Sequence, residues 1–230
     1  MSYKSSVKKG FTLLELLIVI SIIAILSLIL IFALNPAEIL RKARDTQRVS
    51  DLNTIKTALA VYITSTSTPL IGGRVSNMVC KQGIGAGTWY TTGPAAGNIF
   101  YSYPGASTIT GANEGTALTA STTSSANLNN IDGTGWIPVN FETLTAGSPI
   151  SNLPIDPTNS IANLAAPVNT DLVYRYACNA SSTTFEIDAQ LESNEYTVQN
   201  DLRAKDGGNH STLYEQGTNL KILGGSVNTF

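Results

Sequence analysis

Hydrophobic and polar positions divide the chain into stretches with different periods. From Phe11 to Leu34 the sequence is apolar on every side, and Glu15 is the one ionisable residue among these 24 positions. About 20 apolar residues, at about 1.5 Å of rise per residue, cross the hydrocarbon core of a bilayer. We therefore predict a transmembrane helix over residues 11–34.

A second helical stretch is predicted over residues 35–64, where the apolar residues become periodic. Leu52, Ile55, Leu59 and Tyr62 recur every three or four positions and form one face of an amphipathic helix. Residues 38–51 before them are almost entirely polar. We expect the helix to leave the membrane as a polar neck and then to pack on a folded head through its apolar stripe.

Asn35 and Pro36 interrupt the helical pattern between these stretches. Proline removes one helical hydrogen bond and crowds the preceding turn, so one interpretation is a kink or a short unwound segment. The other is a new helix with Asn35 as its N-cap and Pro36 at its first position. The pattern is consistent with both.

The helical period stops at Ser65, and residues 65–230 are predicted to form a globular, β-rich head. Apolar and polar residues alternate over 172–179 and again over 183–192, which predicts a β-hairpin with one buried face. Residues 105–130 are rich in hydroxyls and glycine and are predicted to be an exposed loop or weak strands. The expected fold class is α+β, with a long N-terminal helix packed on an antiparallel sheet.

Charge is distributed unevenly along the chain. The net charge is −2, but residues beyond 65 include 6 basic and 12 acidic side chains, so the head is acidic. Basic residues gather at the two ends of the apolar run, with Lys4, Lys8 and Lys9 before it and Arg41, Lys42, Arg44 and Arg48 after it. An acidic head argues against nucleic acid as a partner, and none is expected.

The basic residues of segment 41–48 have several competing interpretations. They form a solvated helix face, pair with acidic residues of neighbouring copies, or hold anionic lipid head groups. Opposite charges also recur at helical spacing here, namely Glu38 with Lys42, Arg41 with Asp45, and Asp45 with Arg48.

Two cysteines and a single histidine limit the chemistry of the head. Cys80 and Cys178 are an even pair, which predicts one disulfide in an exported protein or else two buried free thiols. His210 is the one histidine, and the chain has neither a Gly-x-Ser-x-Gly motif nor the spacing of a zinc site. We therefore expect no catalytic activity.

The N-terminus resembles the class III signal of type IV pilins and the related pseudopilins. The resemblance is carried by the lysines, by Gly10, by the run Phe11-Thr12-Leu13-Leu14-Glu15 and by the apolar helix after it. It implies that a prepilin peptidase removes a leader of residues 1–10, and that Phe11 becomes an N-methylated first residue. No small-x-small cleavage site lies between Leu26 and Ala37, so the apolar segment is expected to be retained.

The resemblance also gives Glu15 a role in assembly. Cleavage after Gly10 creates an α-amino group at Phe11, and in a staggered filament Glu15 of one chain can neutralise that amine on its neighbour. Two charges that are each costly in an apolar core cost less as a pair, so the pair sets the register. The alternative is an isolated glutamate at the lipid interface.

A second resemblance lies in the head. The segment Leu153-Pro154-Ile155-Asp156-Pro157, followed by Tyr174-Arg175-Tyr176 and Leu191-Glu192, is similar to the LPxDP segment of the major pseudopilins of type II secretion and of related Gram-positive pilins. Prolines near Asp156 predict a rigid surface turn. Some relatives bind calcium in late head loops, where Asp201, Asp206 and Asn209 are the candidates here. Because no regular calcium-loop spacing accompanies them, no metal or cofactor is expected.

These resemblances imply a filament subunit with a pilin fold. The expected partners are further copies of the chain, a prepilin peptidase, an assembly ATPase, an inner-membrane platform protein and the membrane itself. The expected location is the cytoplasmic membrane before assembly, and an extracellular pilus or a periplasmic filament afterwards. The alternatives are a pseudopilin of a type II secretion system and a bitopic membrane anchor with an adhesive or ligand-binding head.

Overall fold

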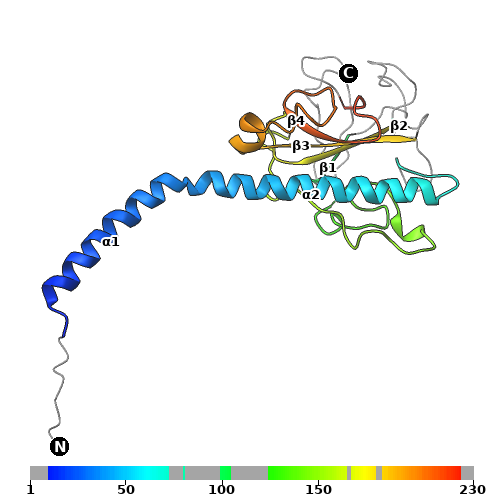
Figure 1. Cartoon of the computed structure of the whole chain (residues 1–230). Helices are drawn as coiled ribbons and strands as arrows, with labels where there is room; N and C mark the ends of the chain where they lie inside the picture. The colour runs from blue at the N-terminus through cyan, green and yellow to red at the C-terminus, as the bar shows by residue number, and fades with distance from the viewer. Residues whose placement is uncertain are drawn as a thin grey trace, which may run out of the picture. The chain divides into compact units, whose positions relative to one another are not determined.

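The computed structural model describes residues 10–72, 80, 99–104, 124–164, 167–179 and 183–223 (Figure 1). The chain divides into two compact units, 1–40 and 41–230. Leader residues 1–9 lie outside the described residues, as does most of the predicted hydroxyl-rich loop, 105–123. The two units are described separately.

The first unit contains helix α1 (Leu13–Leu34) and the first residues of helix α2 (Pro36–Ser65). Asn35 lies between the two helices with φ 41° and ψ 73°, a left-handed conformation that ends α1. Its carbonyl oxygen accepts hydrogen bonds from the backbone N–H groups of Glu38 and Ile39, at 3.0 and 3.3 Å. The backbone thus breaks at Asn35 and resumes with Pro36 in the first helical position, where a missing N–H costs little.

The second unit contains a sheet of β1 (Phe100–Tyr101), β2 (Tyr174–Asn179), β3 (Thr184–Gln190) and β4 (Leu213–Gly217). The strands follow one another in chain order, and every neighbouring pair is antiparallel. Two short helical turns, η1 (Phe141–Thr143) and η2 (Glu195–Gln199), lie in the connections. The predicted α+β class and the predicted hairpin, formed by β2 and β3, are confirmed.

The main core lies where the sheet meets α2. Leu52, Ile55 and Leu59 of α2 are fully buried, which confirms the predicted apolar stripe. They belong to one cluster with Tyr176 and Ile187 of the sheet. The segment 124–155 contributes further core residues, and it lies on the side of α2 away from the sheet (Figure 1, green). The helix is therefore enclosed along its apolar face.

The opposite face of the sheet is also buried, so the prediction of one buried hairpin face is wrong. Ala177 of β2 packs in a second cluster with Ile99, Ile222 and Leu223. Polar side chains of this face, such as Glu186, are also fully buried. Alternation with charged residues indicated a solvated face, but short apolar segments from distant parts of the chain cover it.

A disulfide joins Cys80 to Cys178 at the end of β2, across 98 residues of sequence. Gly72 lies directly against it, because a Cβ at that position would be only 2.3 Å from the Sγ atom of Cys80. The bridge therefore ties the segment after α2 to the sheet, and it needs a glycine beside it.

Candidate functional site

The start of α1 is organised by a reciprocal pair of side chains, Thr12 and Glu15. The Oγ1 atom of Thr12 accepts a hydrogen bond from the Glu15 backbone N–H at 3.2 Å. One carboxylate oxygen of Glu15, Oε2, accepts from the Thr12 backbone N–H at 2.9 Å and from its hydroxyl at 2.8 Å. This is a capping box, in which each side chain satisfies a backbone donor that the helix leaves unpaired.

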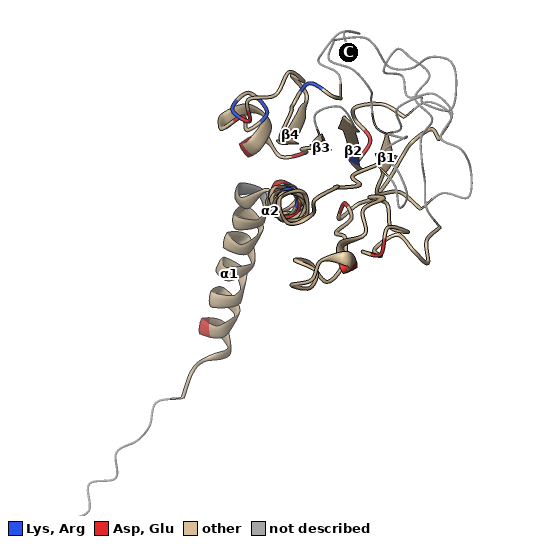
Figure 2. Cartoon of the chain, turned by 90° about the vertical axis from the view of Figure 1, so that its right-hand side faces the viewer, with Lys and Arg blue, Asp and Glu red and all other residues tan. Residues whose placement is uncertain are grey.

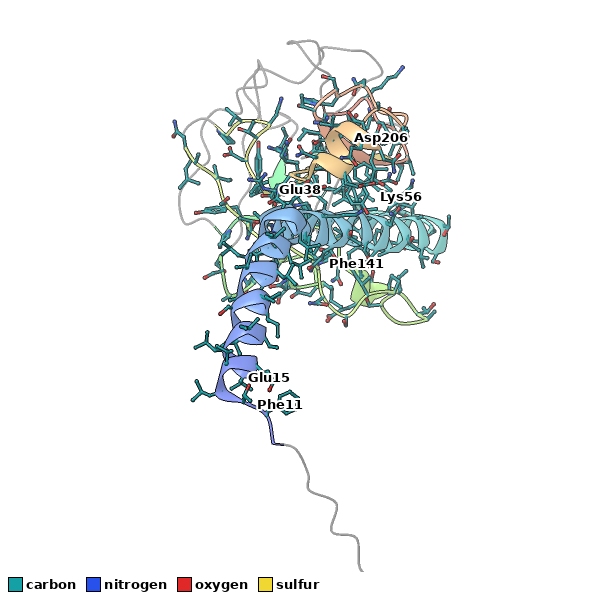
Figure 3. All side chains as sticks on the ribbon, turned by 60° about the vertical axis from the view of Figure 1, so that its left-hand side comes forward. Phe11, Glu15, Glu38, Lys56, Phe141 and Asp206 are labelled. Atoms are coloured by element: carbon teal, nitrogen blue, oxygen red, sulfur yellow. A yellow bond between two sulfur atoms is a disulfide. The ribbon has the colours of Figure 1, made fainter. Side chains whose placement is uncertain are left out.

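The capping box gives Glu15 a role that our sequence analysis missed. The signal was present in the sequence, because Thr12-Leu13-Leu14-Glu15 fits the pattern of Ser or Thr followed three residues later by Glu or Gln. The carboxylate therefore has hydrogen-bond partners within its own chain. Figure 3 shows Phe11 and Glu15 next to each other at the end of the helix.

Beyond Glu15, the described side chains of α1 are uncharged, and all but Ser21 and Ser27 are apolar. Leu13–Ile31 has a mean hydropathy of 3.1, and none of its residues is buried. By length and composition this helix can cross a membrane. In Figure 2 it is free of charge apart from one acidic position near its start. An apolar cylinder of this kind requires lipid or protein around it.

The peptide bond between Gly10 and Phe11 is accessible. Phe11 is 88% exposed, and no atom lies within 4 Å of the place that a Cβ on Gly10 would occupy. Packing within the chain therefore does not require a glycine there.

A second group of charged residues joins α2 to the head. It consists of Asp45, Arg48, Asp156 and Glu192, and we call it the Arg48 cluster. The Arg48 side chain is fully buried. Its guanidinium donates to both carboxylate oxygens of Asp156, at 2.7 and 3.0 Å. It also donates to Asp45 at 2.8 Å and to Glu192 at 2.6 Å. One cation thus holds together the helix, the segment around residue 156 and the end of β3.

The carboxylates of the Arg48 cluster also bind backbone donors. Asp45 accepts from the N–H groups of Glu192 and Ser193. Asp156 accepts from the N–H groups of Thr158 and Asn159, at 2.8 and 3.2 Å. Asp156 thus forms a turn, as predicted, but with 2% exposure it is buried, and the predicted surface position is wrong. The local sequence indicated the turn, whereas the partner of its carboxylate is 108 residues away.

The electrostatics of the cluster favour the charged forms of Arg48 and Glu192. Burial alone would lower the pKa of Arg48, but hydrogen bonds and charge from Asp156 and Glu192 outweigh it and raise that pKa. Burial likewise opposes ionisation of Glu192, yet hydrogen bonds from Arg44 and Arg48 hold its pKa below the usual value. The buried charge of Arg48 therefore has several partners, as a buried ion network requires.

The structure gives the basic residues a role that none of our interpretations included. Arg44 stays partly exposed but forms two hydrogen bonds with Glu192, at 2.8 and 2.9 Å, and Arg48 is buried, so the solvated-face interpretation is wrong for Arg48. The predicted Asp45–Arg48 pair is confirmed. Lys42 stays half exposed, at 3.3 Å from Glu195 and above the ring of Tyr196. The pattern of charges indicated a helix but not that its arginines bind the chain's own head.

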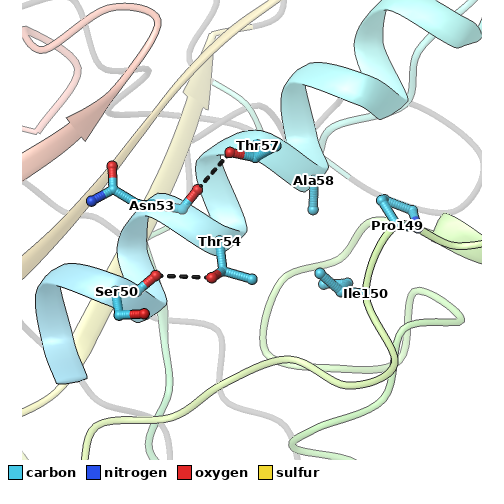
Figure 4. Close-up of a pocket in the computed structure, with 7 residues that line it drawn as sticks. All are labelled: Ser50, Asn53, Thr54, Thr57, Ala58, Pro149 and Ile150. Carbon is cyan, nitrogen blue, oxygen red and sulfur yellow. Dashed lines mark hydrogen bonds between the residues drawn. The ribbon is translucent and has the colours of Figure 1, made fainter.

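A groove of about 490 Å³ runs between α2 and the segment around Pro149 and Ile150 (Figure 4). The hydroxyls of Thr54 and Thr57 donate to the carbonyl oxygens of Ser50 and Asn53 in their own helix. The residues that line the groove include neither an ionisable side chain nor a thiol. They offer shape and hydrogen bonding but no acid–base chemistry.

The candidate calcium residues are held by other parts of the protein. Asp201 binds Arg203, with contacts of 2.9 Å. Asp206 accepts backbone hydrogen bonds from Gly208 and Glu215, each at 2.9 Å. Within the described part of the chain, no three His, Cys, Asp or Glu side chains gather as a metal site would need.

Comparison with known proteins identifies one region of the chain. Residues 5–31 match the family model of the prokaryotic N-terminal methylation motif. Neither a curated protein nor a solved structure matches the chain. The match confirms the class III signal of type IV pilins and pseudopilins that we predicted from the lysines, Gly10 and Phe11–Glu15.

Proposed function

We propose that this chain is a structural subunit of a type IV pilus-like filament, processed by a prepilin peptidase and polymerised through its N-terminal helix. The observation that carries the proposal is the surface of α1, an exposed apolar cylinder directly after the accessible Gly10–Phe11 bond of a methylation motif. The motif is that of pilin-type precursors, which are structural proteins, so the chain has no catalytic role in this proposal.

Processing prepares the helix for assembly. Removal of residues 1–10 takes away Lys4, Lys8 and Lys9, which anchor the N-terminus on the cytoplasmic side. The apolar helix can then exchange lipid for copies of itself. An assembly ATPase and a membrane platform protein would drive this exchange. The chain is accordingly a single-pass protein of the cytoplasmic membrane first and part of an external or periplasmic filament later.

Glu15 sets the stagger between subunits. After cleavage, the new amine of Phe11 on one chain and the carboxylate of Glu15 on the next are opposite charges in an apolar core. A mispositioned subunit would leave one of them unpaired, which costs several kcal/mol in a medium without water. Because Glu15 already binds Thr12 in its own chain, it is held near the helix start where that amine would arrive.

The Arg48 cluster fixes the head to α2. Its contacts join α2 to the segments at residues 156 and 192 with charge-assisted hydrogen bonds of 2.6–3.0 Å. The head is therefore held on α2 by charged contacts as well as by its apolar core.

One observation favours a second candidate, a pseudopilin of a type II secretion system. The segment Leu153–Pro157 is similar to the LPxDP segment of major pseudopilins, and the resemblance continues downstream at Leu191-Glu192. Arg48 joins the two segments, because it donates hydrogen bonds to both Asp156 and Glu192. Antibodies against the exposed residues 145–147 would separate the candidates by electron microscopy of whole cells. Label along long surface fibres would favour the pilus, and label confined beneath the outer surface would favour the pseudopilus.

Substitution of Glu15 tests the filament proposal. With Glu15→Gln we expect normal membrane insertion and processing but loss of filaments from the sheared fraction, because the Phe11 amine loses its partner. Glu142→Gln, which removes an exposed carboxylate from η1, is the control and should assemble normally. Undiminished assembly of Glu15→Gln would overturn this role and leave the bitopic anchor as the better explanation.

A further inference from the structure

The buried second face of the sheet carries an excess of acidic groups. Asp188 lies opposite Glu215 and Arg175 in the strand register, and Glu186 is two residues before Asp188 on the same face. All four side chains belong to residues with at most 1% exposure. Three carboxyl groups and one guanidinium, if all ionised, would give this dry surface a net charge of −2. Unpaired charge of that size is not stable away from water.

Most of these groups have visible partners. Arg175 donates to Asp188 at 3.2 Å. One oxygen of Glu215, Oε2, accepts from the His210 backbone N–H at 2.8 Å. The loop closes so tightly over this carboxylate that a Cβ on Gly208 would lie 1.9 Å from Oε2. Glu215 therefore has no room for a solvent shell on that side.

Glu186 is the exception. Its Oε2 atom accepts from the backbone N–H groups of Ile222 and Leu223, at 2.6 and 2.7 Å. Its other oxygen, Oε1, is buried and accepts no hydrogen bond from any of the described residues. The group next to Glu186 is Glu215, a diagonal neighbour across β3 and β4 and within the reach of long side chains. A proton on Oε1 would let Glu186 donate a hydrogen bond to the carboxylate of Glu215.

We propose that Glu186 carries a proton at neutral pH and donates it to the carboxylate of Glu215, so that one buried proton holds the C-terminal segment 220–223 on the sheet. Burial and the neighbouring Glu215 both raise the pKa of Glu186 well above its ordinary value, in agreement with this arrangement. Ile222 and Leu223 are the anchors, with 1% and 2% exposure.

The other groups around the pair do not replace this proton. From β2 and β3, Arg175 and Asp188 neutralise each other. Asp206 accepts the backbone N–H of Glu215, and Lys221 of the covering segment is exposed. The ring of His210 accepts backbone hydrogen bonds at Nδ1 and stays uncharged at neutral pH. Loss of the proton therefore leaves two adjacent carboxylates that repel each other, and release of the covering segment would let water reach them.

Hydrogen exchange of the full chain in detergent, followed by mass spectrometry, tests whether this proton holds segment 220–223 on the sheet. In the wild type we expect the protection of peptides over 218–223 to fall by about tenfold per pH unit as the pH rises from the ordinary carboxyl range toward the raised pKa of Glu186, because over that range opening releases one proton. An unstructured peptide of the same sequence corrects for the intrinsic effect of pH. Peptides over β4 should keep their protection until the whole head unfolds.

Glu186→Gln is the informative variant, because its amide donates permanently to Glu215 and its carbonyl oxygen still accepts from Ile222 and Leu223. We expect protection over 218–223 that no longer depends on this proton, while Glu142→Gln on exposed η1 behaves like the wild type. An equal pH slope in Glu186→Gln and wild type, or no slope in wild type, would overturn the proposal.

Infrared spectroscopy of the wild type provides a second test that does not depend on a variant. A protonated buried carboxyl group gives a C=O band distinct from that of carboxylates. This band should persist at pH 7, where exposed carboxyl groups have ionised, and its absence would overturn the proposal.

Discussion

Arg48 on α2 and Asp156, 108 residues later in the chain, are joined by two parallel hydrogen bonds of 2.7 and 3.0 Å, and both side chains are fully buried. This bidentate contact is the strongest kind of charge-assisted pair that a protein side chain makes. It fixes α2 to the loop at residue 156, next to Leu153, which packs in the same core as the apolar stripe of the helix.

Removal of one partner should destabilise the head strongly. For Asp156→Asn we expect a loss of about 3 kcal/mol in the free energy of unfolding, at the low end for a broken buried pair because Arg48 keeps Asp45 and Glu192. Urea unfolding of the full chain in detergent, followed by tryptophan fluorescence, measures it. Glu195→Gln, which breaks the exposed pair with Lys42, is the control and should change the free energy by less than about 1 kcal/mol. Equal effects of the two substitutions would contradict the role of the cluster.

Reduction of the disulfide should also destabilise the head. The bridge between Cys80 and Cys178 closes a loop across 98 residues, for which the chain-entropy model gives at most about 4–5 kcal/mol. Unfolding curves with and without reductant measure this contribution. A variant with serine at both positions should not respond to reductant, and an unchanged wild-type curve would rule out a stabilising bridge.

His210 should make the head sensitive to mild acid. Burial and the nearby Arg175 charge lower the pKa of His210 from 6.5 to about 4 in the folded protein. The unfolded chain therefore binds this proton more tightly, so the contribution to stability is complete above pH 6.5 and is lost as the pH falls toward 4. The loss can reach about 3 kcal/mol, since one pKa unit corresponds to about 1.4 kcal/mol.

The comparison that isolates His210 is with His210→Asn, whose side-chain oxygen can accept the backbone N–H groups of Thr212 and Leu213 in place of Nδ1. The difference in unfolding free energy between wild type and variant should change between pH 7 and pH 4, because other titrating groups are common to both. A difference that is constant with pH would show that His210 does not titrate as described.

The hydroxyl of Thr12 should hold the start of α1. Thr12→Val keeps the shape of the side chain but removes the acceptor of the Glu15 N–H and a donor to its carboxylate. We expect the first turn to lose about 1 kcal/mol, as for other lost N-caps, and the Glu15 amide to exchange faster. Thr12→Ser retains the hydroxyl and should behave like the wild type. If the Glu15 amide exchanged at the same rate in Thr12→Val and Thr12→Ser, the hydroxyl of Thr12 would have no such role.

The elements that the sequence predicts best are those with local causes. One helix face is predicted by the spacing of Leu52, Ile55 and Leu59, and it is buried as expected. One face of the hairpin is predicted by the alternation around Tyr176 and Ile187, and that face is also buried. The capping box was equally local and could have been read from Thr12 and Glu15. Periodicity and spacing therefore give the helices, the hairpin and the first turn of α1 without knowledge of the fold.

Features that depend on distant partners could not be predicted in this way. Arg48 lies among charges at helical spacing, which is also the pattern of a solvated helix, and only the fold brings Asp156 to it. Glu186 alternates with apolar residues like a surface position, yet Ile222 and Leu223 cover it. In both cases the sequence gives the chemical group but not the element that buries it.

Mass spectrometry of the subunit in a sheared filament fraction tests the proposed assembly most directly. We predict a chain that begins at Phe11 with a methylated α-amine and retains the whole apolar segment to Leu34. A filament subunit that still begins at Met1, or one that has been trimmed beyond residue 34, would contradict it.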